Sequence, residues 1–287
     1  MTVVPDAFPA AAGRVARWVG RGVQAASAID RTRLLTRALS LGAAALIWQW
    51  ASSHHLSLRV IDFRNVPAPT EVAGAAAALV ASPKLGHHVR SSLFRVFAGF
   101  AAAAVVGIAL GLLVGRLKRA ADLFSPLLEV MRPIPGVAWI PLAILMFPSS
   151  ELSMVFITFM GALFPILLNT VHGVEGLDRR VVAGSRALGA RSVALFREVI
   201  LPGALPSIVT GLSIGMGTAW FCLVTAEMIS GQYGIGYYTW ESYNLQRYPD
   251  IVVGMLFIGF FGMVSSALVK AIGARLTPWY RLEGRTP

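Results

Sequence analysis

The sequence is short of charge and of cysteine. Only 14% of its 287 residues are charged, against about 25% in an ordinary soluble domain. Its single cysteine, Cys222, lies in an apolar stretch, so an intrachain disulfide is excluded and a cysteine metal cluster is not indicated. The chain also has no G-x-x-x-x-G-K-[ST] loop to cradle nucleotide phosphates. We therefore predict no bound cofactor, no metal site and no catalytic residues in this chain.

Other functional classes are disfavoured in the same way. The formal net charge is +11, but no Lys/Arg-rich stretch is interleaved with stacking aromatic residues, so a nucleic-acid partner is not expected. The arginine-rich N-terminal residues lack a compact apolar core with a cleavage site, so they do not resemble a removable signal peptide. A soluble protein with buried helices is also disfavoured, because no soluble core needs several apolar runs of membrane length.

Apolar residues, 56% of the chain, occur in long blocks that predict an all-α, polytopic membrane protein with about six transmembrane helices. Pro126, Pro133, Pro135 and Pro141 lie in the third block, which should therefore be kinked or broken. The six predicted spans cover about residues 35–51, 92–114, 123–147, 151–171, 204–229 and 251–272.

The positions of Lys and Arg predict the orientation. With the N-terminus inside, 18 of the 25 Lys and Arg residues lie in inside segments and 5 lie outside. Because positive residues are retained in the cytoplasm, both termini should be cytoplasmic. This orientation also requires an even number of spans.

These predicted spans divide the chain into three regions. Residues 1–34 form a basic cytoplasmic segment, either an amphipathic helix on an anionic leaflet or a flexible tail. Residues 35–272 form the transmembrane domain, and residues 273–287 form a cytoplasmic tail. Outside the membrane, a helix-start signal at Pro67–Glu71 opens a short helix over 71–81. The pairs His54-His55 and His87-His88 are expected to be solvated, because neighbouring helical residues do not share a face.

The longest inside loop, residues 177–202, is predicted to be a compact helical module. Asp178 is a good N-cap and Gly189 a good residue to follow a helix end, which defines a helix of about ten residues. Ser192 can cap a second helix that ends at Leu201-Pro202. A short helix held rigidly below a membrane domain suits docking into a groove on a partner protein.

This loop resembles the "EAA" loop of binding-protein-dependent importer permeases of the ATP-binding-cassette (ABC) class. The family pattern is E-A-A-x-x-x-G, about ten residues, then L-P; Gly189, Leu201 and Pro202 match it. Ala183 stands at the Glu position, which removes a possible charge contact with the ATPase, and Gly184 and Ser185 replace the two alanines. Segments 66–72, 129–141 and 226–236 are similar to the nitrate/sulfonate/taurine/bicarbonate branch.

The resemblance implies a bacterial inner-membrane, multi-pass importer subunit for a small anion such as a sulfonate, nitrate or bicarbonate. It implies two ABC ATPase subunits that bind ATP and Mg, a periplasmic or lipid-anchored solute-binding protein, and a second permease copy, giving a homodimer in contact with membrane lipid. The predicted ATPase-coupling residues are Ala183, Gly184, Ser185, Arg186, Ala187, Leu188, Gly189, Leu201 and Pro202.

Several intramembrane residues are candidates for the translocation path. Glu129 and Arg132 could pair on one helix face, next to a proline-broken segment that could line a cavity or form a structural pair. Glu227 is either a gating or a structural acid. The complete set is Glu129, Arg132, Pro133, Pro135, Met216, Trp220 and Glu227.

Glycine ridges Gly107-Gly111-Gly115 and Gly211-Gly215 are expected to serve close helix packing rather than solute contact. Two alternative functions make different demands on the sequence. An ion-gradient-driven secondary transporter should show inverted repeats and paired broken helices, whereas only one span is proline-broken. An intramembrane enzyme needs convergent catalytic residues, and no histidine lies well inside a predicted span.

Overall fold

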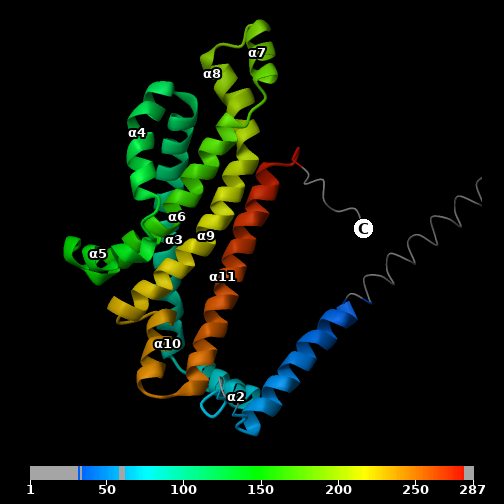
Figure 1. Cartoon of the computed structure of the whole chain (residues 1–287), viewed down its shortest axis with the longest axis vertical. Helices are drawn as coiled ribbons and strands as arrows, with labels where there is room; N and C mark the ends of the chain where they lie inside the picture. Colours follow the sequence, from blue (N-terminus) through cyan, green and yellow to red (C-terminus); the bar gives the residue numbers. More distant parts are fainter. Residues whose placement is uncertain (1–31, 33, 58–61, 281–287) are drawn as a thin grey trace, which may run out of the picture. The chain divides into compact units, whose positions relative to one another are not determined.

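The computed structural model describes residues 32, 34–57 and 62–280 (Figure 1). The chain divides into two compact units, residues 1–71 and 72–287. In the first unit, residues 34–53 are helical, and an antiparallel bridge joins Ser57 to Asp62. The predicted first span lies in this helix. Most of the predicted N-terminal segment 1–34, and the last seven residues of the predicted tail, lie outside the described residues.

Helix α2 (Pro69–Ala81) begins at the predicted proline signal. The Glu71 carboxylate accepts the Ala68 N–H at 3.0 Å, which satisfies a backbone donor at the helix start. With 13 residues and a rise of about 1.5 Å per residue, α2 is too short to cross a bilayer. The sequence-based helix start is confirmed.

The second unit is built on four long helices: α3 (Lys84–Arg116), α6 (Ser150–Glu175), α9 (Leu201–Ser230) and α11 (Tyr248–Leu276). Each is long and apolar enough to cross a membrane, α9 together with the residues from Ser192 onward. They contain the second, fourth, fifth and sixth predicted spans. The expectation of an all-α polytopic membrane protein is therefore confirmed.

The third predicted span is broken. Its first part is α4 (Lys118–Met131), and its second part is η1 (Gly136–Trp139) followed by α5 (Ile140–Met146). The two parts are bent by 85°. Pro133 and Pro135 lie in the gap, where they cannot donate helical backbone hydrogen bonds. Counted as one span, this pair gives up to five candidate spans in the part of the chain searched, so six spans and cytoplasmic termini stay predictions.

Helix α6 lies between α3 and α9 and forms the centre of the second unit (Figure 1). Glycines on α3 allow the close approach, since a Cβ at Gly111 would lie 2.6 Å from the Thr170 side chain. A Cβ at Gly107 would lie 3.1 Å from Ile166, and one at Gly115 would lie 2.9 Å from Val174. The glycine ridge on α3 therefore serves helix packing, as predicted.

A neighbouring face of α6 receives the second glycine ridge. A Cβ at Gly211 of α9 would lie 2.7 Å from Asn169, and one at Gly215 would lie 2.9 Å from Ile166. Ile166 is fully buried because both neighbours approach it. Helix α11 packs on α9, where the Trp220 indole donates a hydrogen bond to the Ser265 hydroxyl at 2.7 Å.

The predicted helical module of the inside loop is present. Its first helix is α7 (Arg179–Ala187), and the Asp178 carboxylate accepts the Arg180 N–H at 2.8 Å as an N-cap. After the helix, Gly189 has φ +88°, a conformation that L-residues with a side chain rarely adopt. Both boundary predictions are confirmed.

The prediction for the second half of this loop is wrong. Ser192 is not a cap; it opens α8 (Ser192–Ala194), whose N-cap is Arg191 without a side-chain hydrogen bond. The second helix does not end at Leu201-Pro202. It continues through a π-helical turn, η2 (Leu195–Ile200), into α9. Proline lacks an N–H, and a wider turn just before it lets the helix continue without that hydrogen bond.

The short helix α10 (Ile235–Asn244) was not predicted from sequence. Its ten residues mix polar and aromatic side chains, so it carries no membrane-length apolar signal. It packs against α9 and α11, and a Cβ at Gly254 of α11 would lie 2.1 Å from the Thr239 hydroxyl. Tertiary contacts therefore stabilise a segment whose sequence is a weak helix signal.

Candidate functional site

Helix α7 is exposed along its length, and none of its residues is buried. Val181 is 55% exposed, and Leu188, which follows the helix, is 92% exposed. The predicted coupling residues from Ala183 to Gly189 all lie on α7 or at its C-terminal turn, and Leu201 and Pro202 begin α9. Exposed aliphatic side chains beside arginines are typical of a surface that another protein covers.

The helical period gives α7 two different faces. Arg179, Val182, Ala183 and Arg186 follow the spacing i, i+3, i+4, i+7 and line a cleft against the ends of α3 and α6. Val181, Ser185 and Leu188 do not line that cleft. One face is therefore directed toward the permease body, and the other is available to a partner.

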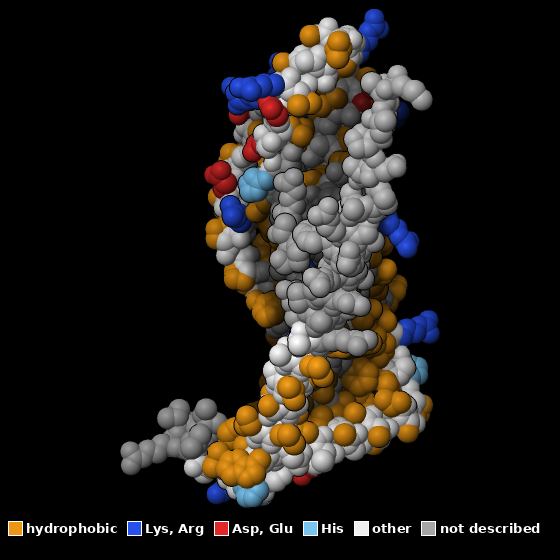
Figure 2. All heavy atoms as spheres, turned by 90° about the vertical axis from the view of Figure 1, so that its right-hand side faces the viewer, with side chains coloured by type: hydrophobic (Ala, Val, Ile, Leu, Met, Phe, Trp, Pro, Cys, Tyr) orange, Lys and Arg blue, Asp and Glu red, His pale blue; other side chains and the backbone are white. Residues whose placement is uncertain are grey.

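A small apolar cluster holds α7 in place. Leu195, Ile200 and Val174 are buried there, and Val182 packs against them. These residues come from the π-helical turn, the end of α6 and α7 itself. On the face shown in Figure 2, Lys and Arg side chains also occur toward the end that carries α7. The helix is therefore a rigid, basic projection rather than a flexible loop.

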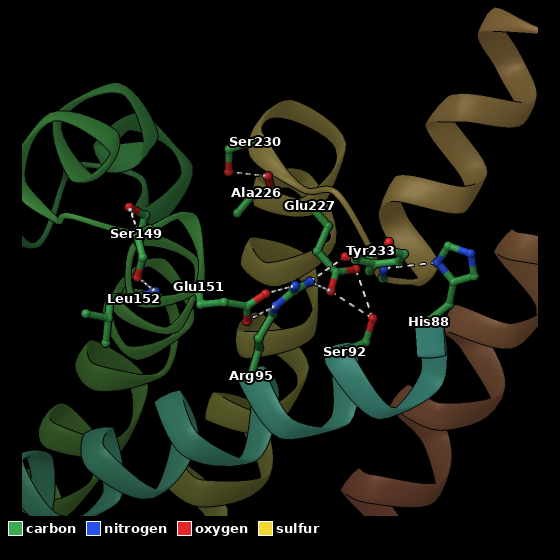
Figure 3. Close-up of polar contacts among 12 residues, drawn as sticks. His88, Ser92, Arg95, Ser149, Glu151, Leu152, Ala226, Glu227, Ser230 and Tyr233 are labelled. Carbon is green, nitrogen blue, oxygen red and sulfur yellow. Dashed lines mark hydrogen bonds and ion pairs between the residues drawn. The ribbon is translucent and has the colours of Figure 1, made fainter. Parts of the chain in front are cut away.

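A buried ionic cluster lies at the other end of the same helices. The Arg95 side chain, on α3, is only 1% exposed. It donates two hydrogen bonds to Glu151 at the start of α6, one of them 2.8 Å long, and one of 2.8 Å to Glu227 near the end of α9. Figure 3 shows the guanidinium between the two carboxylates. Three helices distant in sequence are thus joined through a single side chain.

Glu227 is fully buried, and its charge is matched by hydrogen bonds. Besides Arg95, it accepts from the Ser92 hydroxyl at 2.8 and 3.0 Å and from the Gly236 N–H at 2.9 Å. The Ser92 hydroxyl in turn accepts the Ile235 N–H at 2.9 Å. Side chains of α3 and α9 therefore cap the N-terminus of α10, where a carboxylate is also favoured by the helix dipole.

His88 corrects the expectation of solvated histidines. Its side chain is buried, and Nδ1 accepts the Gly234 N–H at 3.1 Å (Figure 3). That bond requires an unprotonated Nδ1. The prediction failed because it considered only metal chelation by adjacent histidines. His87, the preceding residue, is exposed.

The glycines of the segment 231–236 are needed for this arrangement. Gly234 has φ +133°, and a Cβ there would lie 2.3 Å from the Glu227 carboxyl carbon. A Cβ at Gly236 would lie 2.6 Å from the Val224 carbonyl oxygen. Only glycine allows the backbone N–H groups to approach the carboxylate this closely. The segment thus forms the turn that leads into α10.

Sequence reasoning identified Glu227 but missed its partners. A signal was present: His88, Ser92 and Arg95 follow the spacing i, i+4, i+7, a polar stripe along a helix that is otherwise strongly apolar. That stripe predicts a shared face. The stripe does not identify Glu151 as a partner of Arg95, because these two residues are 56 positions apart in the sequence.

The structure separates the predicted path residues into two groups. Glu129, Arg132, Pro133 and Pro135 are exposed in or after α4, and the structure records no ion pair between Glu129 and Arg132. The other three residues are buried within the subunit: Met216, Trp220 and Glu227. A path role stays a prediction for all seven.

The spacing of the two polar ends matches a bilayer. Arg95 and Arg116 lie 21 residues apart on α3, with no charged residue between them. At about 1.5 Å per residue, this separation is about 30 Å, the thickness of the hydrocarbon core. The buried cluster and the α7 end thus lie at opposite boundaries of an apolar layer.

Comparisons with known proteins agree with this architecture. Residues 103–282 match the family described as "Binding-protein-dependent transport system inner membrane component". The chain is 32% identical to the nitrate import permease protein NrtB of Synechocystis sp., over 88% of this chain and 92% of that protein.

Two further relatives are also permeases. NrtB of Leptolyngbya laminosa is 34% identical over 66% of this chain and 68% of its own length. The bicarbonate transport system permease protein CmpB of Synechococcus elongatus is 35% identical over 62% of this chain and 65% of its own. The chain therefore belongs to the family of inner membrane components of binding-protein-dependent transport systems, the permease subunits of ABC importers.

Proposed function

We propose that this permease imports a small inorganic anion and that α7 is the helix through which a separate ATPase drives it. The observation that carries the proposal is the exposed face of α7, with Val181 uncovered on the helix and Leu188 uncovered directly after it. A surface of this kind suits the groove of a partner protein. We place the subunit in the bacterial inner membrane with six spans and α7 on the cytoplasmic side.

The connection from α7 to the membrane is short and helical. Residues Ser192–Ser230 form one apolar helical stretch of 39 residues, from just after α7 to just after Glu227. Because packed helices move as rigid elements, displacement of α7 by an ATPase would be transmitted toward the buried cluster at the far end. Two ATPase subunits would bind ATP and Mg, and this chain would bind neither.

The solute class is inferred from relatives and from charge. Two of the relatives are named for nitrate import and one for bicarbonate transport. Both solutes are small monovalent oxyanions. Arg132 is an exposed cation beside the break between α4 and η1, and it could attract such an anion along the path. A second permease copy would complete the pore, and an external solute-binding protein would deliver the anion.

The decisive experiment is uptake of nitrate by proteoliposomes that contain the permease and its ATPase, with the solute-binding protein supplied in the external solution. Leu188→Asp and Val181→Asp place a charge on the exposed α7 face without touching a buried residue. We expect both to reduce ATP-driven uptake at least about tenfold, equivalent to a loss of about 1.4 kcal/mol in coupling. Co-purification of the ATPase should fall in parallel.

The matched control is Lys118→Asp, an exposed substitution at the start of α4 and outside the Val181–Leu188 face. It should retain uptake and ATPase co-purification. Unchanged uptake in Leu188→Asp and Val181→Asp would contradict the assignment of α7.

Family membership already favours an importer over the ion-gradient-driven secondary transporter. Uptake driven by a proton or sodium gradient with no ATPase present would reverse that preference.

A further inference from the structure

A cleft of about 580 Å³ lies between α7 and the adjoining ends of α3 and α6. A cavity needs only about 10–15 Å³ to hold one water, so the cleft admits a much larger group. Its charged lining consists of Arg116, Arg179, Arg186 and Glu175. Three arginines and one glutamate therefore line a single concave site.

The charges in this cleft are not paired with each other. Among the described residues, no ion pair involves Glu175 or any of the three arginines. The Nη2 of Arg116 donates to the Ser192 carbonyl oxygen at 3.2 Å, but its buried Nη1 has no hydrogen-bond partner. A buried guanidinium nitrogen without an acceptor is costly unless a ligand supplies one. The cleft therefore carries an excess of two positive charges.

Arg116 is also held in a fixed orientation. Its guanidinium lies over the Phe196 ring, 5.3 Å from the ring centroid, which is a cation–π contact. Together with the Ser192 bond, this contact leaves one edge of the fork free. A preorganised guanidinium suits bidentate recognition of a phosphate or carboxylate and loses little entropy on binding.

The cleft lies where lipid phosphates are expected. Arg116 ends α3, directly after 20 consecutive residues without a charge (96–115). Glu175 similarly ends the apolar helix α6. Side chains at such a boundary reach the headgroup layer of a bilayer. The bound group would also contact Arg179 and Arg186, so it would brace α7 against the spans.

We propose that this cleft binds a phosphate group, presented either by an anionic lipid headgroup or by free phosphate. The proposal depends on Arg116, Arg179 and Arg186 and not on any ATPase. A group bound here would fix the position of α7 from the side opposite its exposed Val181–Leu188 face. The cleft would thus act as a stabilising ligand site within the permease itself.

The test is thermal unfolding of the full-length permease, followed by tryptophan fluorescence, in nanodiscs of phosphatidylcholine. In one arm inorganic phosphate is added while chloride keeps the ionic strength constant. In the other arm part of the lipid is replaced by phosphatidylglycerol. We expect a saturable rise in Tm in at least one arm; a rise with inorganic phosphate identifies free phosphate, and a rise with phosphatidylglycerol alone identifies the lipid.

Three variants make the test specific. Arg186→Gln, which alters no recorded side-chain bond, and Arg116→Gln should lose most of the Tm rise. Arg180→Gln, on the same helix but outside the cleft, should keep it. If Arg116→Gln does not fold, the Tm response of Arg186→Gln alone tests the proposal. The proposal fails if neither arm shifts the wild-type Tm, or if Arg186→Gln responds as Arg180→Gln does. The assay contains no ATPase, so failure here leaves the proposed role of α7 untouched.

Discussion

The two polar ends of the permease use arginine in opposite ways. At the buried end, Arg95 contacts two carboxylates and a carbonyl oxygen and has almost no contact with solvent. At the α7 end, Arg179 and Arg186 line an open cleft without an ion pair among the described residues. A satisfied arginine stabilises a helix arrangement, whereas an unsatisfied one attracts a ligand.

The surrounding groups explain the difference. Glu227 is fully buried and accepts hydrogen bonds from Ser92, Arg95 and the Gly236 N–H, while Glu151 is 55% exposed and can remain hydrated. The Glu151 carboxylate therefore adds little electrostatic repulsion to Glu227, because solvent screens the charge of Glu151. Glu175 at the other end makes no recorded ion pair. The buried end should thus govern stability, and the open end should govern function.

The largest expected effect comes from Arg95→Leu. Loss of this cation leaves Glu227 buried without a counter-charge, which should lower the free energy of unfolding by about 3–5 kcal/mol. Arg186→Leu, at the open end, should change it by less than about 0.5 kcal/mol. Denaturant unfolding of the purified protein in detergent measures both.

A double variant distinguishes loss of the Arg95–Glu227 ion pair from a general loss of packing. Arg95→Leu combined with Glu227→Leu removes both buried charges, so it should be more stable than Arg95→Leu alone. If Arg95→Leu and Arg186→Leu were equally destabilising, the proposed contrast between the two ends would be lost.

The two glycines with positive φ provide a second, smaller comparison. Gly234→Ala places a Cβ against the Glu227 carboxyl at 2.3 Å as well as straining a φ of +133°, so we expect a loss of about 3 kcal/mol. At Gly189, with φ +88°, nothing lies within 4 Å of an added Cβ. Gly189→Ala should therefore cost only about 1 kcal/mol of backbone strain. Thermal unfolding midpoints of the two variants test this order, and equal midpoints would refute it.

The smallest comparison is between two serines. Ser92 links Glu227 to the Ile235 N–H within the buried cluster, so Ser92→Ala should cost about 2 kcal/mol. Ser185 donates only to the Val181 carbonyl oxygen within α7, and Ser185→Ala should change stability by less than about 0.5 kcal/mol. Hydrogen exchange at Ile235 should rise only in Ser92→Ala, and the absence of that rise would show that Ser92 does not hold α10.

Much of the architecture could be predicted from local patterns. Apolar length predicted the spans that correspond to α3, α6, α9 and α11, and prolines predicted the break between α4 and α5. Asp178 and Gly189 predicted both ends of α7 because capping depends on a few adjacent residues. The continuation through Leu201-Pro202 was missed, since a π-helical turn has no reliable sequence signal.

By itself the sequence determined where the chain can cross a membrane and where α7 begins and ends, because these properties depend on hydrophobic length and on side chains within a few residues of each other. Only the tertiary structure decided that Arg95 pairs with Glu151 and Glu227, 56 and 132 positions away. It likewise decided that Arg116 joins Arg179 and Arg186 in one cleft. Charges distant in sequence become partners only through helix packing, and the glycine contacts of α3, α6 and α9 set that packing.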